Sequence, residues 1–163
     1  MWISRLPSSC DGFTIVHLSD LRLDLDTSLT AMIEERIRDL NYDICVIMSD
    51  YRASTSRDFS VCRTELQKLF PSFKTSVFGV FGNHDFIAMV PQLEASEVRM
   101  LLNESIVIQS DSQRIHLAGI DDPYFYRREY FEKALEDVQK GASRFSYPIF
   151  QKYSDERRQR VST

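Results

Sequence analysis

The sequence lacks the features that mark several classes of protein. Its cysteines, Cys10, Cys45 and Cys62, are three in number and widely spaced, which favours reduced thiols of a cytoplasmic protein over a disulfide framework. No apolar run approaches the ~20 residues of a membrane-spanning helix, and residues 1–12 lack the apolar core of a signal peptide. The formal net charge of −4 argues against general nucleic-acid binding, which calls for a basic surface.

What is present is the composition of a globular domain. Of the 163 residues, 43% are hydrophobic and 27% are charged, which is ordinary for a protein with one core. The sequence contains no internal repeat and no low-complexity linker. We expect one domain over residues 1–140 and an irregular tail over residues 141–163, because the tail shows neither strand alternation nor an amphipathic stripe. The sequence gives no indication of the oligomeric state.

The order of apolar segments predicts an α/β fold. Apolar, β-branched runs predict strands, and apolar residues at helical spacing predict helices. In chain order we expect a buried strand at 13–19, a helix capped by Thr27 or Ser28 and running to about 40, a strand at 43–49, a helix at 59–70, a strand at 77–81, a helix at 91–99, strands at 105–109 and 114–120, and a helix at 129–138. This order indicates α/β units followed by an antiparallel hairpin.

Polar residues follow the first three expected strands. Asp20 ends the first and Asp50 the second, and the third leads into Gly82-Asn83-His84-Asp85. Right-handed crossovers would bring these strand ends to one edge of the sheet, where open α/β sheets place their chemistry. Two carboxylates that converge repel each other unless a cation or a proton separates them, and a divalent metal would do so. The alternative is that both aspartates serve as turn or helix-cap residues.

These segments resemble the calcineurin-like metallophosphoesterases. The resemblance rests on Ile-Val-His-Leu-Ser-Asp-Leu-Arg-Leu-Asp at 15–24, Ile-Met-Ser-Asp-Tyr-Arg at 47–52, Gly-Val-Phe-Gly-Asn-His-Asp at 79–85 and the later strand at 115–123. It spans residues 13–140 and implies an α/β/β/α sandwich with two divalent metals, such as Mn, Mg, Fe or Zn. It also implies hydrolysis of a phosphate mono- or diester by a metal-activated water.

The resemblance also implies roles for single residues. Asp20 would bind the first metal, Asp50 would bridge both metals, and Asn83 would bind the second. His84 would be the catalytic residue beside the phosphate, donating a proton to the leaving oxygen or steadying charge in the transition state. Asp85 would orient His84 through a hydrogen bond. No further cofactor and no partner beyond a phosphate-ester substrate is implied.

Three departures from the family pattern leave an alternative open. Arg22 stands where the family has a metal-binding histidine, and arginine offers donors only. Ser49 replaces the usual glycine before the bridging aspartate, and no histidine follows His116, so the later histidine ligands are missing. We therefore expect a sandwich incomplete at its C-terminus, with one weakly held, hydrated metal or none. The alternative is an inactive remnant that acts at most as a binding module. A third possibility is an assembly in which another chain supplies ligands.

Several other residues carry smaller expectations. We expect Cys45 to be a core residue, His17 to be a core or interface residue, and His116 to belong to the sheet. Tyr51 and Arg52 would line a substrate cleft or form a solvated loop. Arg22 would be an inactivating substitution, a residue at the rim of the site, or a phosphate clamp.

Overall fold

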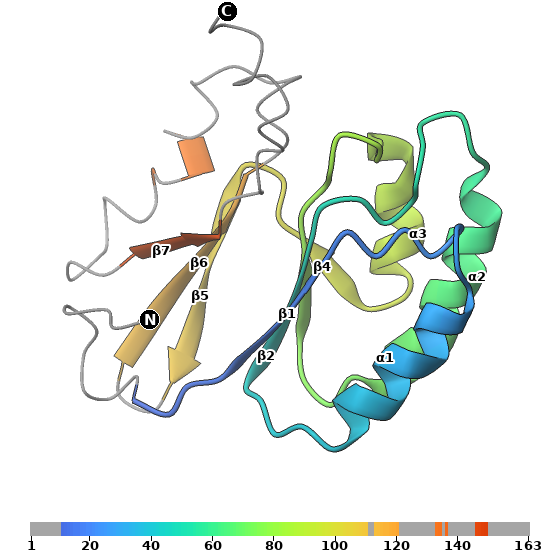
Figure 1. Ribbon diagram of the computed structural model, residues 1–163. Coiled ribbons are helices and arrows are strands. Elements are labelled where there is room, and N and C mark those ends of the chain that lie inside the picture. Colours follow the sequence, from blue (N-terminus) through green and yellow to red (C-terminus); the bar gives the residue numbers. More distant parts are fainter. Residues whose placement is uncertain (1–10, 111–112, 121–132, 135, 137–145, 150–163) are drawn as a thin grey trace, which may run out of the picture.

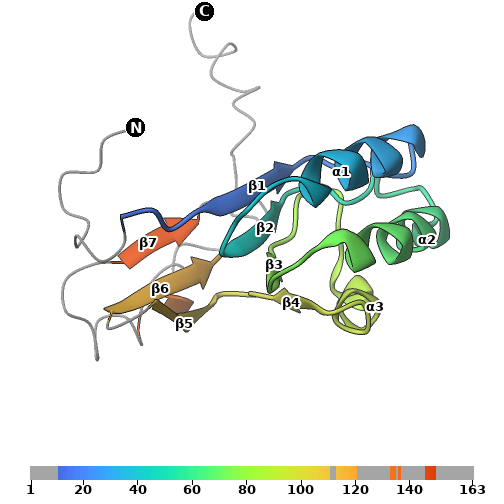
Figure 2. The same cartoon turned by 90° about the horizontal axis from the view of Figure 1, so that it is seen from below.

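Two β-sheets and one layer of helices make up the described part of the chain (Figure 1). The computed structural model describes residues 11–110, 113–120, 133–134, 136 and 146–149. The parallel sheet has the order β1-β2-β3-β4, formed by Ile15–Ser19, Ile44–Met48, Val77–Gly79 and Val98–Met100. Helices α1 (Ser28–Arg38), α2 (Phe59–Leu69) and α3 (Val90–Glu94) lie between these strands in the chain and cover one face of the sheet (Figure 2). The turns η2 (Phe70–Ser72) and η3 (Ile87–Met89) are 3₁₀-helical.

The second sheet has three strands. Strand β5 (Glu104–Ser110) pairs antiparallel with β6 (Gln113–Gly119), and β6 pairs parallel with β7 (Ser146–Ile149). The first two form the late hairpin that the sequence predicts. Strand β7 lies inside the segment 141–163, for which the sequence predicted no regular structure. The proposed boundary at residue 140 stays a prediction, because residues 137–145 and 150–163 lie outside the described part of the chain.

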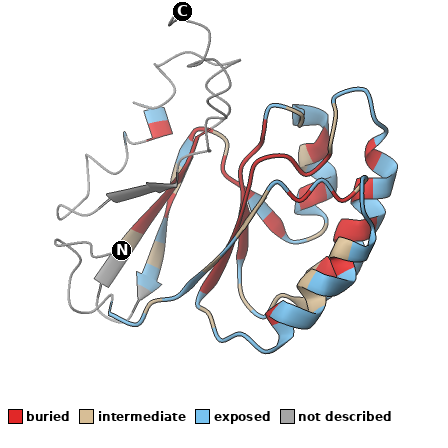
Figure 3. Ribbon diagram, in the orientation of Figure 1, coloured by how far each residue is buried: buried red, intermediate tan, exposed pale blue. Residues whose placement is uncertain are grey.

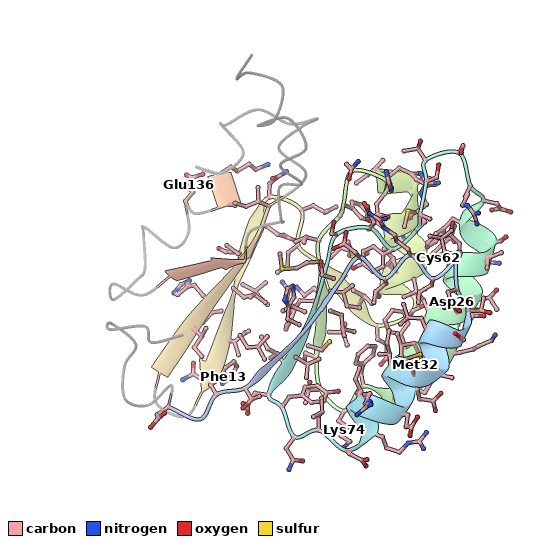
Figure 4. All side chains as sticks on the ribbon, in the orientation of Figure 1. Phe13, Asp26, Met32, Cys62, Lys74 and Glu136 are labelled. Carbon is pink, nitrogen blue, oxygen red and sulfur yellow. The ribbon has the colours of Figure 1, made fainter. Side chains whose placement is uncertain are left out.

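The central strand β2 is buried on both faces, which explains its unbroken apolar run. Cys45 and Ile47 point to the helix layer and join a cluster with Leu66 of α2. The alternate residues of β2 join a second cluster with Leu117 of β6, between the two sheets. Figure 3 shows this contrast between the buried middle of the molecule and the exposed outer faces of the helices. Cys62, labelled in Figure 4, belongs to the helix-side cluster, as does the predicted core residue Cys45.

The α/β prediction is confirmed, and most elements lie within a few residues of their predicted positions. The helix predicted at 91–99 is wrong in its second half, because α3 ends at Glu94 and Val98–Met100 form β4. Glu97, at φ 63°, has a left-handed backbone that breaks the helix before β4. The helix predicted at 129–138 lies largely outside the described residues.

Two further predictions about the first α/β unit are wrong. Strand β1 is not buried: Ile15 is 44% exposed and His17 is also exposed, because β1 pairs only with β2 among the described strands. Neither Thr27 nor Ser28 caps α1 with its side chain. Instead, Asp26 accepts hydrogen bonds from the backbone N–H and the hydroxyl of Ser28, at 2.9 and 2.6 Å. No helix among the described residues is both long enough and apolar enough to cross a membrane.

Candidate functional site

The loops that leave β1 and β2 run side by side at the carboxyl edge of the parallel sheet. The backbone N–H of Asp20 donates to the carbonyl of Met48 at 3.2 Å, and that of Arg22 donates to the carbonyl of Asp50 at 3.1 Å. Strand β3 pairs with the other side of β2 and leads into the turn at residues 82–85. Parallel pairing therefore brings the polar ends of three strands to one edge, as the sequence predicts.

The carboxylate of Asp50 lies at the centre of this edge and is only 2% exposed. Its Oδ1 accepts a hydrogen bond from the backbone N–H of His84 at 3.1 Å. Its Oδ2 accepts from Nη2 of Arg22 at 3.3 Å and lies 3.2 Å from Nδ1 of His84. The imidazole is within ion-pairing distance, but Nδ1 is not aligned for a hydrogen bond. A buried carboxylate thus faces two nitrogen groups through a single oxygen.

Arg22 connects Asp50 to Asp20. Its Nη2 atom lies 3.6 Å from Oδ1 of Asp20 as well as 3.3 Å from Oδ2 of Asp50. The side chains of Arg22 and Asp20 are 43% and 42% exposed, so this end of the site is open to solvent. The cation that two converging carboxylates require is therefore supplied here by a side chain of the protein itself.

Asp85 does not orient the ring of His84, which corrects the prediction made for it. Its carboxyl oxygens accept hydrogen bonds from the backbone N–H groups of Gly82, at 2.8 Å, and of Tyr51, at 3.1 Å. Burial raises the pKa of Asp85 to about 8, although these N–H groups favour the charged form. Asp85 therefore joins the turn after β3 to the loop after β2, and Asp50 is the carboxylate that faces His84.

The backbone at this edge is unusual in three places. Asp20, Arg22 and Ser49 have φ angles of 54°, 43° and 69°, in the left-handed region that non-glycine residues rarely adopt. Such strain tends to gather at functional sites, where the surrounding structure enforces it. Gly82 is needed for another reason: a Cβ atom built there would lie 2.1 Å from Oδ1 of Asp50. The turn after β3 therefore packs directly on the central carboxylate.

Asn83 and Arg52 line a cleft of about 1040 Å³ next to the turn after β3. Asn83 is exposed, and it precedes His84 in the turn. Arg52 is buried: its Nε donates to the carbonyl of His84 at 2.5 Å, and its guanidinium lies 4.2 Å from the centre of the Phe86 ring. Tyr51 is fully buried, so it lines no cleft and belongs to no solvated loop. The cleft is lined by Arg52, Thr55, Arg57, Asp58, Phe59, Ser60, Arg63, Phe81, Gly82, Asn83, Asp85, Phe86, Ile87, Ala88 and Gln92.

Sequence reasoning missed the structural role of Asp24. Its Oδ1 accepts from the backbone N–H of Ala53 at 2.7 Å, and its Oδ2 lies 3.7 Å from Nε of Arg57. This buried carboxylate holds the loop after β1 against the loop after β2. The one indication in the sequence was that Asp24 lies two residues after Arg22, at the end of the same motif. His116 lies buried in β6, as predicted, and takes no part in the site.

The residues at this edge do not form the two-metal centre that the resemblance implies. Among the described residues, no three His, Cys, Asp or Glu side chains gather where a metal ion could be held. The place between Asp20 and Asp50 does not fit a metal, because the Arg22 guanidinium lies there. Asp50 at the end of β2 and the exposed Asn83 in the turn after β3 carry oxygen donors of the kind that Mg²⁺ or Mn²⁺ prefers.

No family model matches this chain. Among curated proteins, it is 26% identical over 136 residues to YkoQ of Bacillus subtilis, an uncharacterized metallophosphoesterase. The match covers 78% of this chain and 49% of YkoQ, so the chain spans about half the length of that relative. Among solved structures, a protein of unknown function from Aquifex aeolicus matches with a TM-score of 0.46 and 14% identity, over 89% of this chain and 82% of that one.

Proposed function

We propose that the strand-end site of this chain binds one divalent cation and hydrolyses a phosphate ester, a proposal that the 26% identity to the metallophosphoesterase YkoQ supports. One observation supports this proposal above the others. The ends of three neighbouring strands converge on the buried carboxylate of Asp50, with His84 held 3.2 Å away. If Asp20 and Asp50 served only as turn or helix-cap residues, three strand ends would not need to meet at a buried carboxylate.

The residues would divide the work as follows. Asp50 and Asn83 would hold the cation, which when bound supplies positive charge to the phosphate and an activated water. Nδ1 of His84 lies 3.2 Å from Oδ2 of Asp50, which would leave Nε2 as the ring nitrogen that can face a substrate. His84 would then hold or release a proton at Nε2 for the leaving oxygen of the ester. Its own backbone N–H bond to Asp50 fixes the residue in place.

The cleft beside Asn83 would receive the rest of the ester. Its walls carry Ser60 and Arg63 of α2, and Phe86 just before η3. Polar and aromatic groups together suit a substrate that has both a phosphate and an organic part. The cleft adjoins the site through Asn83 and Asp85, which line it.

One observation favours a second candidate function, which is binding without turnover. Arg22 already neutralises Asp50, and a cation held only by Asp50 and Asn83 would be weak and hydrated. Such a site would bind a cation and a phosphate ester and release the ester unchanged. Both candidates predict cation binding, and they differ only in catalysis.

The experiment combines Mn²⁺ calorimetry with hydrolysis of p-nitrophenyl phosphate and bis(p-nitrophenyl) phosphate. We expect one weak Mn²⁺ site per chain that is lost in Asp50→Asn and Asn83→Ala, and turnover that is lost in His84→Gln. Asp39→Asn, an exposed aspartate at the end of α1, is the matched control and should behave as wild type. Binding without turnover would establish the second candidate, and the absence of binding would refute both.

A further inference from the structure

We propose that the guanidinium of Arg22 is a built-in cation that keeps a metal ion out of the Asp20–Asp50 pair. The proposal rests on the proposed function only for the single cation at Asp50 and Asn83, and the experiment below separates the two. It predicts that removal of the Arg22 charge creates a divalent-cation site where none now exists.

The first argument is the position of the charge. Nη2 of Arg22 lies 3.6 Å from Asp20 and 3.3 Å from Asp50, between carboxylates from two neighbouring strand ends. Asp50 is 2% exposed, and a buried carboxylate is costly unless it is paired. Arg22 therefore meets the need that a metal ion would otherwise meet.

The second argument is that the fold delivers Arg22 to this place. Its backbone N–H donates to the carbonyl of Asp50 at 3.1 Å, and its carbonyl accepts from Leu25 at 2.9 Å. Its φ of 43° is left-handed, a conformation that persists only where the surroundings enforce it. The side chain thus starts from a fixed point beside Asp50.

The third argument is that one oxygen of Asp50, Oδ2, already has two nitrogen groups beside it. Oδ2 of Asp50 has Arg22 at 3.3 Å and Nδ1 of His84 at 3.2 Å. Arginine stays protonated and has no lone pair to give, so it cannot become a ligand and it repels an incoming cation. A metal ion would have to displace the guanidinium to reach this oxygen.

The test counts Mn²⁺ ions per chain by calorimetry for wild type, Arg22→Met, Arg22→His and Arg22→Lys. Thermal unfolding with and without Mn²⁺ gives a second readout that is independent of activity. Met removes the charge, His offers an imidazole ligand, and Lys keeps the charge. Arg38→Met is the matched control, because Arg38 also pairs with a carboxylate, Glu34, at 2.8 Å on an exposed surface.

We expect Arg22→Met and Arg22→His each to bind one Mn²⁺ more than wild type, and Mn²⁺ to raise their unfolding temperatures more than it raises that of wild type. Arg22→Lys and Arg38→Met should match wild type. Adding Asp20→Asn to Arg22→Met should remove the gained ion. Two ions bound by the wild type, or no gain in a folded Arg22→His or Arg22→Met, would overturn the proposal.

The same data separate this proposal from the proposed function. If wild type binds no Mn²⁺ but Arg22→His binds one, the single site at Asp50 and Asn83 fails and the exclusion by Arg22 stands. If wild type binds one ion that Asn83→Ala removes, and the Arg22 variants add none, the single site at Asp50 and Asn83 stands and the exclusion by Arg22 fails. Should Arg22→Met not fold, Arg22→His carries the test, since it keeps a polar group beside Asp50.

Discussion

Replacing Ser49 by glycine tests whether the carboxyl edge of the sheet stores backbone strain. Ser49 is buried between β2 and Asp50 with a φ of 69°. A left-handed backbone costs a non-glycine residue about 1–2 kcal/mol, while glycine loses about 0.5–1 kcal/mol more entropy on folding. The net expectation is a stabilisation of about 0.5–1 kcal/mol, which in a chain of this size raises the unfolding temperature by about 1–4 °C.

The assay is urea denaturation followed by circular dichroism, with Ser49→Ala as the matched control. Alanine removes the hydroxyl but keeps the Cβ atom, so it retains the strain and should stay within about 0.5 kcal/mol of wild type. Mn²⁺ binding should be unchanged in Ser49→Gly, because Asp50 keeps its contacts. If Ser49→Gly were no more stable than Ser49→Ala, the φ angle would not be a source of strain, and the reasoning would be wrong.

Three further predictions concern the site and the core. Gly82→Ala should lower stability by about 1–3 kcal/mol in urea denaturation and weaken Mn²⁺ binding, because the added Cβ would lie 2.1 Å from Oδ1 of Asp50; wild-type stability would contradict this. Leu66→Ala, at a fully buried position of α2, should cost about 2–5 kcal/mol, whereas the exposed Leu25→Ala should cost little. Hydrogen bonds from Ser60 lower the pKa of the α2 cap Asp58, so its contribution to stability is present above the ordinary carboxyl pKa and is lost as the pH falls through its lowered folded-state pKa. Asp58→Asn should flatten this acid dependence in denaturation curves below about pH 4, and parallel curves for the two proteins would contradict it.

Local sequence patterns were enough to predict the two long helices and the central strand. Residues 28–38 and 59–69 place apolar side chains at helical spacing, and the all-apolar strand β2 indicates burial on both faces. Strand β4 was not predicted, because it has only three residues and no glycine or proline separates it from the short helix before it. Strand β7 was not predicted, because it forms through long-range pairing with β6 and its four residues show no strand pattern of their own.

The sequence by itself determined which strand ends would meet. Asp20, Asp50 and the turn with Asn83 and His84 each follow a strand, and parallel pairing brings such ends to one edge. The roles of these residues as metal ligands and catalyst stay predictions. The resemblance to metallophosphoesterases, visible in the same segments, agrees with the similarity to YkoQ.

Only the tertiary structure decided what each side chain faces. It placed Arg22 between two carboxylates, turned His84 toward Asp50 and directed Asp85 to backbone N–H groups. These outcomes depend on the φ angles of the loops and on the contact between Gly82 and Asp50. A residue's place at the end of a parallel strand fixes the edge of the sheet at which it lies, and the strand itself can be recognised from its local apolar pattern. The direction of a loop side chain depends on hydrogen bonds between segments about 30 residues apart in the chain, such as the bond from Arg22 to Asp50, and no local pattern encodes those.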